Sequence, residues 1–175
     1  MRALTLALFT LMYMETSAQR QTDWDRPLNF QCSSTANGIS YVISVHDKRK
    51  KERRFLFVCR PVHAVSGSVS CHLSGYVNSY DQPFLFTCPN GGYLNGVSDV
   101  HNNSEKDRLY RFRCCTPSSG YYHTDCTWTG WVNNWSEYFT YFTPRNYIIK
   151  GVHSIHNNRK KDRRFQFEIC RITPH

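Results

Sequence analysis

Apolar and polar residues alternate in three stretches of the chain, and each stretch begins with an acidic residue followed by an arginine. These stretches are residues 52–59, 107–114 and 162–170. In the second, residues 110, 112 and 114 alternate with mostly polar neighbours. A period of two is typical of a strand with one buried face. No window keeps helical spacing over three turns, and Asn, Gly, Ser and Pro separate the stretches, so the pattern predicts an all-β fold.

The same features recur at a fixed offset. Cys126 lies 55 positions after Cys71, and the second and third copies align without a gap. A first copy aligns as well, except that Cys32 lies one position short of the register of Cys88. Such self-similarity indicates repeated structural units. We predict a single domain over residues 19–175 with pseudo-threefold symmetry, compatible with a trefoil-like fold, whose units span about 19–60, 71–115 and 126–170.

The first residues resemble an export signal. Arg2 precedes an apolar run, Ala3–Met14, and small residues follow at positions 16–18. The run is too short to span a bilayer, and no second candidate follows it. We predict a signal peptide over residues 1–18, a mature chain that begins at Gln19, and secretion to the extracellular space or matrix.

Composition supports a folded, basic protein. Hydrophobic residues make up 40% of the chain and aromatic residues 15%, which is enough for a core and excludes a disordered chain. The net charge of +9 is unchanged by removal of the leader, because Arg2 and Glu15 leave together. The partners are therefore expected to be anionic. Export argues against a nucleic-acid partner or a nuclear address.

The eight cysteines all follow the predicted cleavage site, and an even number in an exported chain indicates disulfides. The repeat selects among the pairings. At an offset of 55, Cys88 aligns with Thr143 and Cys114 with Ile169, so the third unit lacks both together. Two cysteines that are absent together are expected to be partners. The predicted pairs are Cys32–Cys59, Cys88–Cys114, Cys71–Cys115 and Cys126–Cys170. Clustered zinc ligands are missing, so no metal or cofactor is expected.

The chain resembles the dermatopontin family, and within it the hemagglutinin/amebocyte aggregation factor type. The resemblance rests on the acid-Arg-x-aromatic-x-aromatic stretches that close on cysteine, on 77–81 and 132–136, and on the loops at 101–108 and 156–165. It covers essentially the whole mature chain. Phe55, Tyr110 and Phe165 stand where that type favours Trp. The resemblance implies an extracellular, non-enzymatic adhesive protein that agglutinates cells, binds surface glycans or organises matrix.

Two runs of basic residues are the main candidates for ligand binding. They comprise Lys48, Arg49, Lys50, Lys51, Arg53 and Arg54 in the first unit, and Arg159, Lys160, Lys161, Arg163 and Arg164 in the third. Arginine donates in a planar fork that suits sulfate and phosphate. We predict that these hairpin tips face several directions and bind sulfated or sialylated glycans, proteoglycans or lipopolysaccharide. The alternative is a set of solvated tips without a ligand.

Other repeated residues have competing interpretations. The pairs Glu52-Arg53, Asp107-Arg108 and Asp162-Arg163 recur whatever the local charge, which favours structural ion pairs over ligand binding. The histidines at 46, 101 and 156 either converge, which would allow a metal site or a pH switch, or lie on three separate faces; the simpler interpretation is a turn residue at the end of a strand. The aromatic residues of the third unit favour core packing over sugar stacking. They are Trp128, Trp131, Trp135, Tyr138, Tyr141 and Tyr147.

Asn102 and Asn134 begin glycosylation sequons, and the polar loop makes Asn102 the better acceptor. No Gly-x-Ser-x-Gly motif is present and every cysteine is assigned to a disulfide, so an enzyme, such as a basic hydrolase, is not expected. Two functions remain: a lectin-like factor that aggregates cells, and a matrix protein that binds collagen or proteoglycan and organises fibrils. A homo-oligomer is compatible with both.

Overall fold

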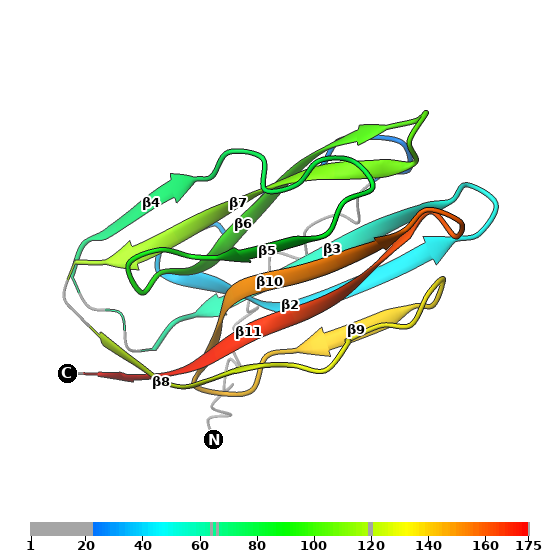
Figure 1. Ribbon diagram of the computed structural model, residues 1–175. Coiled ribbons are helices and arrows are strands. Elements are labelled where there is room, and N and C mark those ends of the chain that lie inside the picture. The colour runs from blue at the N-terminus through cyan, green and yellow to red at the C-terminus, as the bar shows by residue number, and fades with distance from the viewer. Residues whose placement is uncertain (1–22, 64, 66, 119–120, 175) are drawn as a thin grey trace, which may run out of the picture.

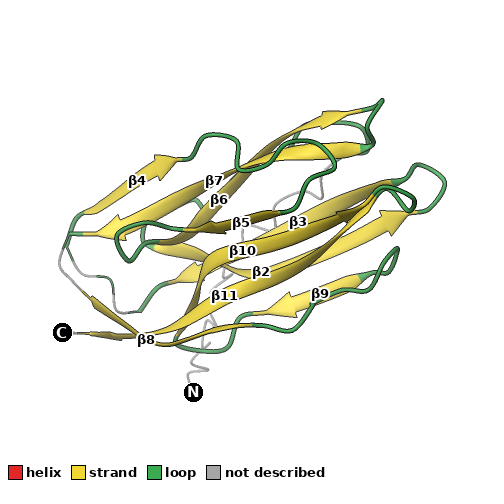
Figure 2. Ribbon diagram, in the orientation of Figure 1, coloured by secondary structure: helices red, strands yellow, loops and turns green. Residues whose placement is uncertain are grey.

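The computed structural model describes residues 23–63, 65, 67–118 and 121–174, and within them the chain forms strands, turns and loops without a helix (Figure 2). The all-β prediction is confirmed. No helix in this part of the chain is long and apolar enough to cross a membrane. The predicted signal peptide lies outside the described residues. The strands are β1 (Asn29–Gln31), β2 (Asn37–Asp47), β3 (Glu52–Pro61), β4 (Val69–Leu73), β5 (Phe84–Thr87), β6 (Tyr93–Asn102), β7 (Asp107–Pro117), β8 (Tyr121–Trp128), β9 (Phe139–Phe142), β10 (Tyr147–Asn157) and β11 (Asp162–Pro174).

Three long hairpins, β2–β3, β6–β7 and β10–β11, form the body of the domain, and their tips lie at one end of it, on the right in Figure 1. Each hairpin gains a third strand from another sequence unit: β9 pairs with β2, β1 with β6, and β5 with β10. The strand orders of the three sheets are β3-β2-β9, β1-β6-β7-β4 and β5-β10-β11-β8. Because each unit gives a strand to the next hairpin, no unit completes its sheet alone.

The three hairpins share an irregularity at equivalent positions. The register shifts between Ile39 and Tyr41, between Leu94 and Gly96, and between Ile149 and Gly151. At Gly96 a Cβ atom would lie 2.6 Å from the carbonyl oxygen of Phe30, and at Gly151 it would lie 2.7 Å from that of Phe86. Glycine at these two positions therefore lets β1 and β5 approach closely enough to pair.

The core lies between the inner faces of the three sheets and consists of layers with one residue from each hairpin. The layers are Ile39, Leu94 and Ile149; Val42, Val97 and Val152; Phe55, Tyr110 and Phe165; and Phe57, Phe112 and Phe167. The rings of Phe55 and Tyr110 both meet Phe165 edge to face, with centroids 5.6 and 6.4 Å apart. Since every layer draws on all three hairpins, the sheets are stabilised together.

Four disulfides join Cys32 to Cys59, Cys71 to Cys115, Cys88 to Cys114 and Cys126 to Cys170, the pairs that the repeat predicts. Two of them link paired strands of one sheet, β4 with β7 and β8 with β11. The other two join different sheets, because Cys32 follows β1 and Cys88 follows β5. At the equivalent position of the third unit, Thr143 and Ile169 take the place of the two cysteines and are both buried.

The hairpins, bulges and core layers thus repeat at the predicted offset. These pairings do not test the trefoil-like arrangement or the predicted boundaries of the domain, which stay predictions.

Candidate functional site

The residues that directly follow the three hairpin tips form a closed ring of ion pairs. We call them the charged ring. The pairs are Arg53 with Asp162, Arg108 with Glu52, and Arg163 with Asp107. Arg53 donates from Nε and Nη2 to both carboxylate oxygens of Asp162, at 2.8 and 2.9 Å, and Arg163 makes the same two-point contact with Asp107 at 2.7 and 2.6 Å. Every arginine pairs with the acid of a different hairpin, so the ring ties the three tips together.

The charged ring is buried, and further hydrogen bonds offset the cost of removing its charges from water. Its six residues are at most 5% exposed. Backbone N–H groups of Asp25, Asp81 and Ser136 donate to the acids at 2.7, 2.8 and 2.7 Å, and these three residues adopt φ of 55°, 62° and 61°. Buried pairs stabilise a fold only with such geometry and added partners. The interpretation of the acid-arginine motif as a structural ion pair is confirmed, with the partner in another unit.

Asp99 distinguishes the second hairpin from the other two. It accepts from Arg108 Nη1 at 2.7 Å and from the backbone N–H of Leu28 at 2.9 Å. The equivalent positions hold Ser44 and Ser154, both fully buried. Burial raises the pKa of Asp99 to about 6, although Arg108 acts in the opposite direction. In the sequence, the signal for this difference is one acid in place of two serines at a repeated position.

The three repeated histidines lie beside the charged ring, each next to a different acid. Their side chains are 1% exposed. His46 Nε2 lies 3.9 Å from Asp162, His101 Nε2 lies 3.8 Å from Glu52, and His156 Nδ1 lies 3.1 Å from an oxygen of Asp81. Each histidine thus has its own neighbouring carboxylate, and the three do not share one centre. The metal site and the pH switch stay predictions.

We expect the free energy of unfolding to fall as the pH drops from about 7.5 to about 6. Burial lowers the pKa of His46, His101 and His123 below the ordinary 6.5, although nearby carboxylates oppose the shift for each. As the pH falls through 6.5, these histidines bind protons more readily in the unfolded chain than in the folded protein, so acidification favours unfolding. Asp99 opposes this in the lower part of the window, because its pKa, raised to about 6, lets the folded protein take up a proton there from about pH 7 downward. Urea unfolding across the window measures the slope.

A His101→Gln variant is the control for this pH dependence, because it removes one of the three titrating groups and should flatten the slope. A free energy of unfolding that stays constant between about pH 7.5 and about 6 would contradict the argument.

Two sets of side chains have ligand atoms close enough for a metal ion. They are Asp25, Glu52 and His101, and Asp81, Asp107 and His156. Cations of the protein already contact their carboxylates: Lys106 Nζ lies 3.5 Å from Asp25, and Lys161 Nζ lies 3.2 Å from Asp81. The arginines of the ring balance the remaining acids. Every carboxylate of the two sets thus has a cationic partner within the chain, and nothing in their geometry favours a metal over these side chains.

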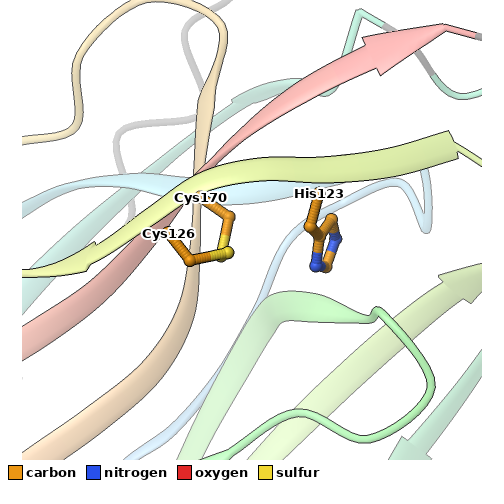
Figure 3. A group of neighbouring side chains, drawn as sticks. All are labelled: His123, Cys126 and Cys170. Carbon is orange, nitrogen blue, oxygen red and sulfur yellow. A yellow bond between two sulfur atoms is a disulfide. The ribbon is translucent and has the colours of Figure 1, made fainter.

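A third set, His123, Cys126 and Cys170, is drawn in Figure 3. The bond between the two sulfur atoms is the disulfide of β8 and β11, so neither cysteine offers a thiolate. A metal ion bound by cysteine requires the thiolate. The disulfide therefore excludes both cysteines as metal ligands in the oxidised protein.

The basic residues predicted to bind ligand divide into three groups. Arg53 and Arg163 are buried in the charged ring, so they cannot reach a ligand without breaking it. Lys161 pairs with Asp81, while Arg54 and Arg164 lie over tryptophan rings. The exposed cations are Lys48, Arg49, Lys50, Lys51, Arg159 and Lys160.

The expectation that the tips face several directions is wrong. Because the charged ring joins the residues that follow each tip, residues 48–51, 103–106 and 158–161 gather at one end of the domain (Figure 1). We call these three tips the cationic end. The middle tip contributes Lys106 but also Glu105. Sites at a single end do not by themselves bridge two cells.

The core-packing interpretation of the aromatic residues holds for only some of them. Tyr141 and Tyr147 pack against the core cluster. Trp128 is 37% exposed and Tyr138 is 61% exposed. Trp131 and Trp135 are half-buried, and no tryptophan belongs to the described core. For the tryptophans the interpretation is wrong, because Trp128 ends the outer strand β8 and Trp131 and Trp135 lie on the loop that follows it.

The two sequons differ in how they are placed. Asn102 is half-buried at the end of β6, where its Oδ1 accepts from the N–H groups of Ser104 and Glu105. Asn134 is exposed, and its Nδ2 donates to Glu137. Glycosylation at either residue stays a prediction.

Comparison with known proteins agrees with the resemblance seen in the sequence. The family model described as Dermatopontin matches residues 22–174. The hemagglutinin/amebocyte aggregation factor of Limulus polyphemus is 36% identical over 152 residues, which are 86% of each chain. Dermatopontin of Biomphalaria glabrata is 33% identical over 97 residues, 55% of this chain and 64% of that protein. Human dermatopontin is 23% identical over 154 residues, 83% of this chain and 73% of the relative. No solved structure matches. The chain therefore belongs to the dermatopontin family.

Proposed function

We propose that this protein is an extracellular, non-enzymatic adhesive protein that binds anionic glycans on cell surfaces or in the matrix through its cationic end. The observation that carries the proposal is the gathering of exposed cations at the tips of two neighbouring hairpins. No carboxylate of the described residues forms an ion pair with any of them. They are Lys48, Arg49, Lys50, Lys51, Arg159 and Lys160.

The chemistry of these side chains suits sulfate, phosphate and carboxylate groups. Lysine supplies a mobile point charge and arginine a planar pair of donors. The tips are fixed beneath by the charged ring, so less ordering is required when a ligand binds. A relative named as a hemagglutinin and aggregation factor, together with four disulfides typical of exported proteins, supports adhesion outside the cell.

Removal of one exposed cation from each basic tip tests the proposal. We expect the double variant Lys50→Ala, Lys160→Ala to bind heparin with roughly tenfold lower affinity, because two exposed contacts to a polyanion are lost. Binding of the unchanged protein should weaken steeply as salt is added, since salt screens exposed charges. Affinity measured on immobilised heparin at several salt concentrations gives both results.

The matched control removes two cations at the other end of the molecule. Arg145 precedes β10 and Arg171 lies near the end of β11, and both are exposed. The variant Arg145→Ala, Arg171→Ala should keep most of its heparin affinity. Equal losses in the two variants would show that only net charge matters, and binding that ignores salt would reject the cationic end.

A second candidate function, a matrix protein that binds collagen or proteoglycan, is supported by the relatives named dermatopontin. Competition separates the two candidates. Soluble glycan should abolish cell clumping by an aggregation factor, whereas it should leave the incorporation of a fibril-organising protein into matrix unchanged.

A further inference from the structure

The outer faces of the three sheets carry arginines in a different setting from the charged ring. Arg54 on β3, Arg111 on β7 and Arg164 on β11 occupy positions whose neighbours in the strand are buried, so their side chains point outward. No carboxylate of the described residues pairs with any of the three. The ring arginines, in contrast, all have a carboxylate partner.

Each outer arginine lies over an aromatic ring that a loop brings across the sheet. The guanidinium carbon of Arg54 is 3.9 Å from the ring centre of Trp24, and that of Arg111 is 5.4 Å from Tyr76. Arg164 lies between two rings, 4.8 Å from Trp131 and 5.7 Å from Trp135. Contacts of this kind attract a cation but do not neutralise it.

Two of these guanidinium groups are also held by the backbone. Arg111 donates from Nε to the carbonyl oxygen of Ser74 at 2.9 Å, and Arg164 donates from Nε to that of Asn133 at 3.0 Å. With Nε engaged and the group resting on a ring, the two terminal nitrogens are fixed in direction. This geometry presents paired N–H donors to an acceptor that approaches from solvent.

The rings beside these donors keep part of their surface open, since Trp24, Trp131 and Trp135 are only half-buried. Tyr76 is 52% exposed. In the third sheet, Trp128 is 37% exposed, and the ring of His153 lies 5.3 Å from that of Trp131. An apolar partner would leave the guanidinium unpaired, and a simple ion would leave the rings uncovered. A sugar that bears an acidic group satisfies both parts, because its C–H face packs on the ring while its acid accepts two N–H bonds.

We propose that the outer arginine–aromatic pairs are binding sites for acidic saccharide residues, carboxylated or sulfated, and that they make the protein multivalent. The sites are Arg54 with Trp24, Arg111 with Tyr76, and Arg164 with Trp131 and Trp135. The inner faces of the three sheets share one core, so the outer faces point away from one another. Several weak sites that diverge can cross-link surfaces, which the cationic end alone cannot do. The ligand class rests on the proposed function.

Aggregation of coated beads tests this inference. We expect the variant Tyr76→Ala, Trp131→Ala to require roughly tenfold or more protein to clump beads that carry an acidic glycan, because two of the three sites lose an aromatic ring. Its elution from heparin should shift far less than that of the Lys50→Ala, Lys160→Ala variant, since no charge has been removed and the cationic end is intact. Beads with sialylated and with heparin-type glycans, run in parallel, distinguish a carboxylate ligand from a sulfate ligand.

Two further variants keep the test decisive. Tyr138→Ala removes an aromatic side chain that is 61% exposed and over which the described residues place no guanidinium, and it should clump beads normally. Arg111→Lys with Arg164→Lys keeps the charge but loses the planar donors, so it should lose clumping even if the aromatic variant folds poorly.

The inference is overturned if both double variants clump beads of both kinds as well as the unchanged protein does. That outcome would leave the proposed function intact, because glycan binding at the cationic end is read separately from the heparin affinity of the Lys50→Ala, Lys160→Ala protein.

Discussion

Asp107→Ala is expected to lower the free energy of unfolding by about 3–5 kcal/mol, because it leaves Arg163 buried without its carboxylate. Arg163 is 3% exposed and donates to both oxygens of Asp107. Burial tends to raise the pKa of Asp107, but the Arg163 guanidinium outweighs it and holds the pKa below 3.8. The acid is thus ionised in the folded protein at neutral pH. Denaturant unfolding at pH 7 measures the loss.

Two control variants distinguish the loss of a charged-ring contact from the general effect of removing a charge. Glu137 is exposed and contacts Asn134 through its carboxylate, so Glu137→Ala should change stability by less than about 0.5 kcal/mol. The double variant Asp107→Ala, Arg163→Met removes the unpaired cation and should recover part of the loss. A loss below about 1 kcal/mol for Asp107→Ala alone would show that the ring does not hold the tips together.

The disulfides give the second large effect. Replacing Cys88 and Cys114 by alanine is expected to cost about 3.5 kcal/mol, and replacing Cys126 and Cys170 about 4 kcal/mol, from the entropy that each bond removes from the unfolded chain. The loops that they close span 26 and 44 residues. The first bond also joins two sheets, whereas the second joins paired strands of one sheet.

This difference makes the two disulfide variants informative as a pair. If only chain entropy matters, the variant without the Cys126–Cys170 bond, which closes the 44-residue loop, is the less stable one. A larger loss for the Cys88, Cys114 variant would show that the bond between sheets also stabilises the folded state. Stability close to that of the unchanged protein in both variants would contradict the assignment of these bonds as structural.

Local pattern and self-similarity were sufficient for much of this description. Alternation along residues 107–114 predicted a strand, and β7 begins at Asp107. The absence of two aligned cysteines from the third unit selected one of many possible pairings, and the structure has that pairing. These inferences succeed because strand periodicity and the repeat offset are properties of the chain itself, and equivalent positions fold into equivalent places.

The sequence did not predict how the basic residues of the candidate site are arranged. Arg53 and Lys50 belong to one basic run, yet the first is buried against Asp162 and the second is exposed. The spacing of basic residues along the sequence does not predict which of them pairs with an acid more than 100 residues away. The tryptophans of the third unit look like core residues by hydrophobicity, but β8 and the loop that follows it place them outside the core.

The chain alone determined an all-β protein of repeated hairpins, four disulfide pairs, a net positive charge and a resemblance to the dermatopontin family. Only the tertiary structure shows that each unit contributes a strand to the sheet of another unit and that the three tips lie at one end. It also decides which arginine pairs with a carboxylate and which packs on an aromatic ring, as for the neighbours Arg53 and Arg54. The reason is that strand periodicity and the cysteine repeat can be read within the sequence itself, whereas the burial of a charge depends on which distant side chain lies next to it in space.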